Sequence, residues 1–267
     1  MIDFGPAERP VDALFLHANG FNALTYRTIL APLANRFRIL AYDQRGHGGT
    51  SLATKLEART NWLDMRDDLL AFAEAEGLCQ VVLAGHSMGA TASVLAAAQD
   101  PALARRLVLF DPVMAPEQAV HAAADSPLLA AALKRRAIFP SRAAALAHYL
   151  GRGAFRSWPE VMVEDYVAGG FHDTQDGDVT LACAPSWEAS NYAAHAHDSF
   201  GALAAVGVTT DIFAAEQGST LRAPPDIGWP QAFAHVRLRI IAGASHFLPM
   251  ERSELARGAI SCAIEGG

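Results

Sequence analysis

The sequence predicts an α/β fold in which a mostly parallel central sheet is flanked by helices. Short apolar runs rich in Val, Ile, Leu and Phe recur along the chain, as is typical of strands buried on both faces. Longer segments with apolar residues at helical spacing lie between these runs. The chain has 267 residues, of which 51% are hydrophobic and 18% charged, so it can bury the core of one large domain.

Six apolar runs are the expected strands of this sheet. They span Ala13–His17, Arg38–Asp43, Gln80–Gly85, Leu107–Asp111, Asp211–Ala215 and Leu238–Ala242. The helical patterns between and after them span Thr25–Arg36, Asn61–Glu76, Met88–Gln99 and Glu251–Ile264. Because strands and helices alternate, we expect the strands to pair in parallel.

The alternation stops after Pro112 and resumes near Gly207. No strand pattern is visible in this segment, and about 95 residues are too many for a simple connection between two core strands. Its Ala-rich helical stretches are Glu117–Ala124, Pro127–Ala137, Arg142–Tyr149, Pro159–Ala168 and Ser186–His195. We therefore expect residues 112–207 to form a helical lid, or cap, inserted into a core domain made of residues 1–111 and 208–267.

Charge and composition exclude several classes of partner. A net charge of −7 disfavours nucleic acid and anionic membranes, which both require a basic face. The first ten residues lack the charged start and apolar core of a signal peptide, and no apolar stretch approaches the ~20 residues that span a bilayer. The three cysteines form no CxxC pair, which fits free thiols in the cytoplasm. We expect a monomer or homodimer acting on a small molecule.

The strongest motif is Gly85-His86-Ser87-Met88-Gly89, directly after an expected strand and directly before an expected helix. Glycines on both sides permit a sharp turn that lifts the serine hydroxyl off the sheet, and the following helix directs N–H groups at a developing oxyanion. Ser87 is therefore the predicted nucleophile.

Serine needs a base to act as a nucleophile, and in this architecture the base is a histidine just after the last strand. His246 follows the expected strand Leu238–Ala242 by four residues, in a turn before the final helix. We predict that it accepts the Ser87 proton. The ten histidines show no metal-ligand spacing such as HExxH, so neither a metal nor a cofactor is expected.

Taken together, these motifs make the chain similar to the α/β-hydrolase superfamily, in the branch of lid-bearing esterases, lactonases and carbon–carbon bond hydrolases. The resemblance covers nearly the whole length. It rests on Gly85–Gly89, on His246, on Leu16–Phe21, which resembles the family's His-Gly loop, and on Tyr42–Gly48, which resembles its Asp-x-Arg-Gly-x-Gly turn.

The resemblance implies an oxyanion hole formed by the N–H of Met88 and one N–H from the His17 loop. An ungapped match assigns the second donor to Asn19. Ala18 stands where the family usually has glycine, so the loop could be shaped differently, and Phe21 is the alternative donor.

The catalytic acid departs from the family pattern. A Gly-Glu-x-Asp sequence usually follows the strand before the last, but this chain has Ala215-Glu216-Gln217-Gly218. Asp111, at the end of an earlier strand, is one candidate, because some family members place their acid there. Glu216 is the other, since its longer side chain could reach His246. We favour Asp111.

These roles predict a serine hydrolase that cleaves a carboxylic ester or lactone of a mostly apolar small molecule. The side chains expected to line its pocket are Phe21, His86, Phe139, Trp158, Trp187 and Phe247. Carbon–carbon bond hydrolysis or cofactor-free peroxidase chemistry would use the same serine and histidine and stays open. A non-catalytic ligand-binding relative is the third hypothesis, although it would have no need of Ser87 and His246 together.

Overall fold

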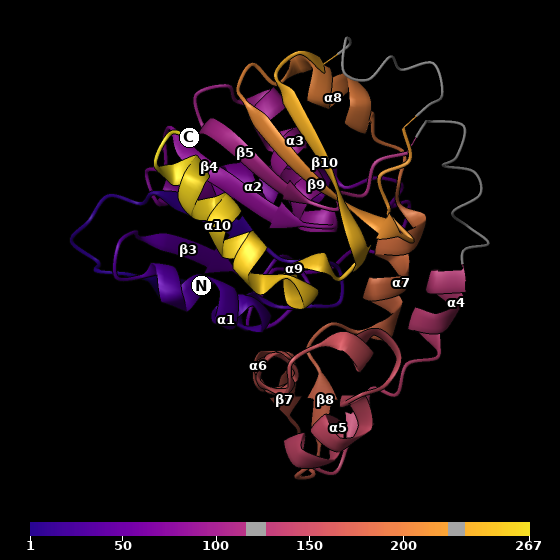
Figure 1. The fold of residues 1–267 in the computed structure, drawn as a ribbon. Helices are drawn as coiled ribbons and strands as arrows, with labels where there is room; N and C mark the ends of the chain where they lie inside the picture. Colours follow the sequence, from indigo (N-terminus) through magenta and orange to yellow (C-terminus); the bar gives the residue numbers. More distant parts are fainter. Residues whose placement is uncertain (116–126, 224–232) are drawn as a thin grey trace.

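A computed structural model describes residues 1–115, 127–223 and 233–267. Its centre is a seven-stranded sheet with the order β1-β3-β2-β4-β5-β9-β10 (Figure 1). The strands span Ile2–Phe4 (β1), Ala13–Leu16 (β2), Ile39–Tyr42 (β3), Val81–His86 (β4), Ala104–Phe110 (β5), Thr210–Gln217 (β9) and Val236–Ser245 (β10). β1 pairs antiparallel with β3, and the other neighbouring strands pair in parallel. The expected mostly parallel sheet is confirmed.

Each expected strand corresponds to one of the strands β2, β3, β4, β5, β9 and β10. β1 was not predicted, because a run of three residues is too short to show periodicity. It adds an antiparallel strand next to β3, at the side of the sheet opposite β10.

Helices cover both faces of this sheet (Figure 1). Along β2, Leu14 and Leu16 point into one apolar cluster and Phe15 into the other, as the two-residue period of a strand requires. The first cluster is closed by α2 (Leu63–Ala75) and α3 (Met88–Gln99). The second is closed by short helical turns after β2 and by the C-terminal helices.

One expected helix is divided in the structure. The segment Thr25–Arg36 consists of the 3-10 helix η1 (Ala23–Tyr26), α1 (Arg27–Leu30) and η2 (Ala31–Leu33), the last with a proline in its first turn. The expected C-terminal helix Glu251–Ile264 corresponds to α10 (Ser253–Ile264), and the short helix α9 (Leu248–Glu251) precedes it.

The segment between β5 and β9 contains most of the remaining helices. They are α4 (Pro127–Leu133), α5 (Arg142–Tyr149), η4 (Gly153–Ser157), α6 (Glu160–Gly169), α7 (Pro185–Ala193) and α8 (Ser199–Ala205). In Figure 1, α4 to α7 gather on one side of the main sheet, whereas α8 lies against α3. The expected helix Glu117–Ala124 falls outside the described residues.

The expectation that residues 112–207 contain no strand is wrong. Strands β6 (Ile138–Phe139), β7 (Phe171–Asp173) and β8 (Val179–Leu181) form a small antiparallel sheet in this segment. They are two or three residues long, too short for a visible alternation. The Asp176-Gly177 pair in the β7–β8 turn was the available hairpin signal.

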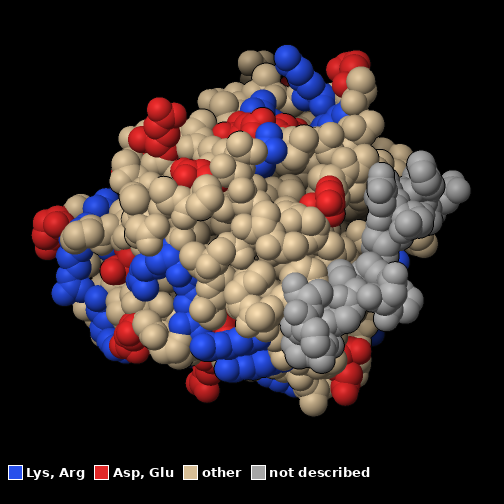
Figure 2. Space-filling view, turned by 90° about the horizontal axis from the view of Figure 1, so that it is seen from above, with Lys and Arg blue, Asp and Glu red and all other residues tan. Residues whose placement is uncertain are grey.

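The surface carries charges of both signs. On the face shown in Figure 2, Lys and Arg side chains are interspersed with Asp and Glu around the margin, and uncharged residues cover most of the centre. In the part of the chain that the structure describes, no helix combines the length and apolar character needed to cross a membrane.

Candidate active site

Ser87 lies in a strained turn between β4 and α3. Its φ of 55° and ψ of −119° fall outside the regions that non-glycine residues usually adopt. The neighbouring glycines are needed because main-chain atoms approach them closely. A Cβ on Gly85 would lie 2.7 Å from the Ala90 nitrogen, and one on Gly89 would lie 2.4 Å from the Leu16 carbonyl oxygen.

Three polar side chains form a continuous chain of contacts at this turn. His246 Nε2 lies 3.0 Å from Ser87 Oγ, and His246 Nδ1 lies 2.6 Å from Asp111 Oδ2. Each residue directly follows a strand: Ser87 follows β4, Asp111 follows β5 and His246 follows β10. The carboxyl ends of parallel strands meet at one edge of a sheet, which brings together residues far apart in the sequence.

The carboxylate of Asp111 is fully buried and densely hydrogen bonded. Oδ1 accepts hydrogen bonds from the Ala215 N–H at 2.8 Å and the Ser219 hydroxyl at 2.6 Å, and Oδ2 accepts one from the Thr220 N–H at 3.0 Å. Burial alone would raise the pKa of Asp111. The hydrogen bonds and the charge of His246 outweigh burial and hold this pKa below its ordinary value, so the carboxylate is ionised at neutral pH.

Glu216, the alternative acid, lies elsewhere. It is exposed within β9, and its Oε2 accepts a hydrogen bond from the Gly243 N–H at 2.8 Å. That contact ties β9 to β10 and directs the carboxylate to the main chain. Of the two candidate acids, only Asp111 contacts the ring of His246 in the described structure.

The main-chain N–H groups of the His17 loop differ in availability. Ala18 N–H donates to the Tyr26 hydroxyl at 3.2 Å, Gly20 N–H to His47 Nε2 at 3.0 Å, and Phe21 N–H to the Ala18 carbonyl at 3.2 Å. The N–H of Asn19 has no acceptor among the described residues. In this loop, therefore, Asn19 is free to donate, whereas the alternative donor Phe21 is already engaged.

A second available N–H belongs to Met88, the residue directly after Ser87. Met88 is the first residue of α3, and the first N–H groups of a helix have no acceptor within it. The positive end of the helix dipole lies at the same place. An anionic oxygen beside Ser87 would therefore meet a favourable field.

Three buried histidines surround the turn as fixed hydrogen-bonding groups. Burial lowers the pKa of His17 to about 4 and those of His47 and His86 to about 3, because the charged imidazolium is poorly solvated there. All three are neutral at physiological pH. His17 Nε2 accepts a hydrogen bond from the Gln44 N–H at 2.9 Å, which joins the loop to the turn after β3.

Two of the six expected pocket residues, His86 and Phe247, contact His246, and two more, Phe21 and Trp158, pack against Phe247. The Phe247 ring centroid is 5.6 Å from that of His246 and 6.2 Å from that of Phe21, and Trp158 lies 5.1 Å from Phe21. His86 lies 5.0 Å from His246. Together they form an aromatic wall next to the imidazole.

The other two expected pocket residues are placed elsewhere. Phe139 is buried in the small sheet, 5.7 Å from the Phe171 ring. Trp187 is buried against the turn after β3, where its indole N–H donates to the Arg45 carbonyl at 2.8 Å. Aromatic content alone could not show which of these rings lie near His246.

Tyr26, Ser219 and Thr220 belong to the site but were not predicted from the sequence. Tyr26 sits within an apolar helical pattern and gives no signal of its polar role. Ser219 and Thr220 follow Gly218, the vacant acid position, and two adjacent hydroxyls there were the available sign that this turn binds a carboxylate from another strand.

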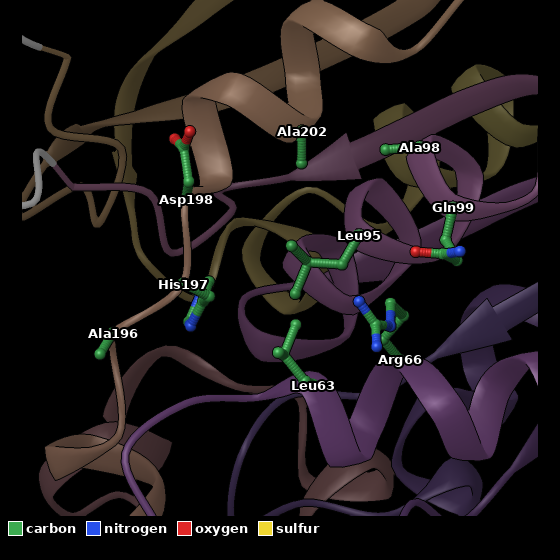
Figure 3. A pocket seen from close by; sticks show the side chains of 9 residues that line it. All are labelled: Leu63, Arg66, Leu95, Ala98, Gln99, Ala196, His197, Asp198 and Ala202. Carbon is green, nitrogen blue, oxygen red and sulfur yellow. The ribbon is translucent and has the colours of Figure 1, made fainter.

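A separate pocket of about 340 Å³ lies away from this site (Figure 3). Its lining residues are Leu63, Arg66, Leu95, Ala98, Gln99, Ala196, His197, Asp198 and Ala202. The α3 residues among them come from the second half of that helix, beginning about 12 Å along its axis from Ser87. None of the residues in contact with Ser87 or His246 lines this pocket.

Part of the chain is similar in sequence to known proteins. The chain resembles the 2-(acetamidomethylene)succinate hydrolase of Mesorhizobium japonicum, at 37% identity over 98 residues, which is 37% of this chain and 34% of that protein. It also resembles the N-formylmaleamate deformylase of Pseudomonas putida, at 39% identity over 90 residues, 34% of this chain and 33% of that protein. The chain thus matches about a third of the length of these relatives.

Solved structures share the fold over the whole chain. A crystal structure of E-2-(acetamidomethylene)succinate hydrolase superposes with a TM-score of 0.82 at 23% identity, covering 99% of this chain and 94% of that one. The model of the alpha/beta hydrolase family matches residues 13–257. Since that match spans well over half of the chain, the chain belongs to the alpha/beta hydrolase family.

Proposed function

We propose that this chain is a serine hydrolase that cleaves a carboxylic ester or lactone of a mostly apolar small molecule through an acyl-enzyme on Ser87. The observation that carries the proposal is the unbroken chain from Ser87 Oγ through the His246 ring to Asp111, with distances of 3.0 and 2.6 Å. Nucleophile, base and orienting acid are already within hydrogen-bonding reach.

The reaction follows from these contacts. Ser87 Oγ attacks the carbonyl carbon while its proton passes to His246 Nε2. Asp111 holds Nδ1–H, fixes the tautomer and stabilises the imidazolium. The tetrahedral intermediate then expels the leaving alkoxide, which takes the proton from Nε2. Water, deprotonated by the same nitrogen, cleaves the acyl-enzyme and restores Ser87.

The N–H groups of Met88 and Asn19 would bind the oxyanion of that intermediate. Both lack an acceptor in the described structure; Asn19 belongs to the loop after β2, and Met88 is the first residue of α3. Donors held in place before the reaction stabilise developing charge without reorganisation, and loss of one typically costs about 10²–10³ in turnover.

The aromatic wall supports an apolar substrate. Phe247 packs beside His246, and Phe21 and Trp158 pack against Phe247, so the part of the substrate next to the scissile carbonyl would meet rings. Trp158 comes from the segment between β5 and β9, which supports the division into a core of residues 1–111 and 208–267 and a substrate-covering lid within residues 112–207.

Hydrolysis of an N-acyl group is a second candidate. The two relatives are named for an acetamido compound and an N-formyl compound. The same residues could catalyse it, because His246 Nε2 can return its proton to a leaving nitrogen as well as to an oxygen.

The test is a panel of acyl esters, lactones and N-acyl compounds of graded chain length, assayed with the wild type, Ser87→Ala and Ser93→Ala. Loss of the nucleophile should reduce turnover by about 10⁶. Ser93 is a matched control, because it is equally buried in α3 and its hydroxyl donates to the Gly89 carbonyl without contacting His246. Hydrolysis that survives in Ser87→Ala would refute the acyl-enzyme mechanism.

A further inference from the structure

We propose that α7 positions the oxyanion donor, with Asn191 and Glu188 as positioning residues that hold the Asn19 main chain in place. The proposal rests on the proposed function, because the orientation of the Asn19 N–H matters only if that group binds the oxyanion. It assigns to the inserted segment a role in the chemical step, in addition to covering the substrate.

The side-chain amide of Asn19 is held at both ends by α7. Its Nδ2 donates to the Glu188 carbonyl at 3.0 Å, and its Oδ1 accepts a hydrogen bond from Asn191 Nδ2 at 2.7 Å. All three residues are buried. An amide fixed at its oxygen and its nitrogen cannot rotate, so the Cα of Asn19 and the N–H attached to it are restrained as well.

The carboxylate of Glu188 restrains the next residue of the loop. Gly20 has a φ of +75°, and a Cβ on it would lie 2.7 Å from Glu188 Oε1. Glu188 Oε2 is paired with Arg135 at 2.5 Å, and Arg135 also donates to the Tyr166 hydroxyl at 2.5 Å. The buried charge of Glu188 is therefore neutralised by a cation that links it to α6.

Two tryptophans attach α7 to the core domain. The indole N–H of Trp187, near the start of α7, donates to the Arg45 carbonyl at 2.8 Å. That of Trp62, just before α2, donates to the Asn191 carbonyl at 3.1 Å. The helix is thus fixed to the core near both ends, as a support for the loop must be.

Loss of these contacts should weaken the stabilisation of the transition state without changing the affinity for the substrate. The loop would keep its N–H, but the direction of that N–H would no longer be fixed. Since the oxyanion forms only during the reaction, turnover should fall while substrate binding stays the same. The expected loss is about 10- to 100-fold, less than the ~10²–10³ for complete removal of a donor.

Asn191→Leu removes the donor to Asn19 with little change in volume, and Asn19→Ala removes both amide contacts but keeps the main-chain N–H.

The first measurement is the second-order rate constant for labelling of Ser87 by an alkyl fluorophosphonate, followed by intact mass. In this step the Ser87 Oγ–P bond forms, the P–F bond breaks, fluoride leaves and the serine proton passes to His246. The phosphoryl oxygen occupies the oxyanion site, so no natural substrate is required.

Both variants should be labelled about 10- to 100-fold more slowly than the wild type. The double variant should be no slower than the slower single variant, because the two changes break one shared contact. On the best ester of the panel, kcat should fall in parallel and KM should stay within about twofold. Ser190→Ala, in the same helix with its hydroxyl bonded to the Trp187 carbonyl, should match the wild type.

Thermal unfolding identifies variants that are folded at the assay temperature, and Asn19→Ala suffices if Asn191→Leu does not fold. Wild-type labelling rates in folded variants would overturn the role of α7 and leave Ser87 as nucleophile. A raised KM with unchanged kcat would also overturn it, by assigning α7 to substrate binding. A wild type whose Ser87 is not labelled at all would instead refute the proposed function, and this inference with it.

Discussion

His86 donates a hydrogen bond from Nε2 to the main-chain carbonyl of His246, at a distance of 2.7 Å. A carbonyl can only accept, so the proton of His86 is on Nε2, and its Nδ1 must accept from the Tyr26 hydroxyl at 2.7 Å. The Tyr26 oxygen in turn accepts from the Ala18 N–H at 3.2 Å. One buried chain therefore connects the backbone of the proposed base with the oxyanion loop.

Removing the hydroxyl in Tyr26→Phe should weaken this chain at its centre. It leaves His86 Nδ1 and the Ala18 N–H without partners in a buried place, which typically costs about 1–3 kcal/mol per group. Turnover should also fall, because both His246 and the residue before Asn19 lose a restraint. Urea unfolding and kcat on the best substrate measure the two effects.

Tyr42→Phe is the matched control for that change. The Tyr42 hydroxyl is also buried, but it has no hydrogen-bond partner among the described residues. Its removal should leave turnover unchanged. Stability should stay the same or rise slightly. Equal effects of the two substitutions would show that the Tyr26–His86 contact contributes neither to stability nor to turnover.

The two candidate acids can be separated by isosteric substitution. Asp111→Asn should lower turnover by about 10⁴ with the fold intact, because an amide cannot stabilise the imidazolium and favours the wrong tautomer. Glu216→Gln should keep nearly full activity, since Glu216 contacts the Gly243 N–H and an amide oxygen can still accept that bond. The reverse result would transfer the acid role to Glu216.

Some residues of the site have a local signal in the sequence, whereas others are joined only by long-range contacts. Ser87 and His246 could be predicted because each follows its own strand directly and the signal lies within a few residues. The sequence favoured Asp111 but left Glu216 open, because the choice depends on which strand end faces His246 across β9. The contact of Asn19 with Asn191 joins positions 172 apart, so no spacing in the sequence points to it.

Acid should destabilise the fold through its buried histidines. His17, His47 and His86 have pKa values of about 4, 3 and 3, against 6.5 when exposed. At a pH between the folded and the unfolded pKa, the unfolded chain therefore binds more protons than the folded chain. The free energy of unfolding should therefore fall as the pH drops below about 6.5, by about 1.4 kcal/mol per pH unit for each such group. The pKa of Asp111 is lowered from 3.8, so its contribution is lost only at lower pH.

Urea unfolding between about pH 7.5 and about pH 5 measures this dependence. In His47→Gln the side-chain oxygen can accept the Gly20 N–H in place of Nε2, but the residue no longer titrates. Its stability should therefore depend less steeply on pH than that of the wild type. A wild type equally stable across this range would mean that these histidines are protonated in the folded chain.

The nucleophile turn should tolerate no side chain at Gly89. In Gly89→Ala the new Cβ would lie 2.4 Å from the Leu16 carbonyl oxygen and 2.5 Å from that of His17, so α3 must move away from the loop. Overpacking of this kind typically costs about 1–3 kcal/mol, and the shift would also separate the Met88 and Asn19 donors.

At Gly258, in α10, no described heavy atom outside the helix lies within 4 Å of an added Cβ. Gly258→Ala should therefore stabilise the helix by about 0.5–1 kcal/mol. Thermal unfolding and turnover of the two variants test the contrast, and a Gly89→Ala protein with wild-type stability and activity would show that the turn is not limited by main-chain contact.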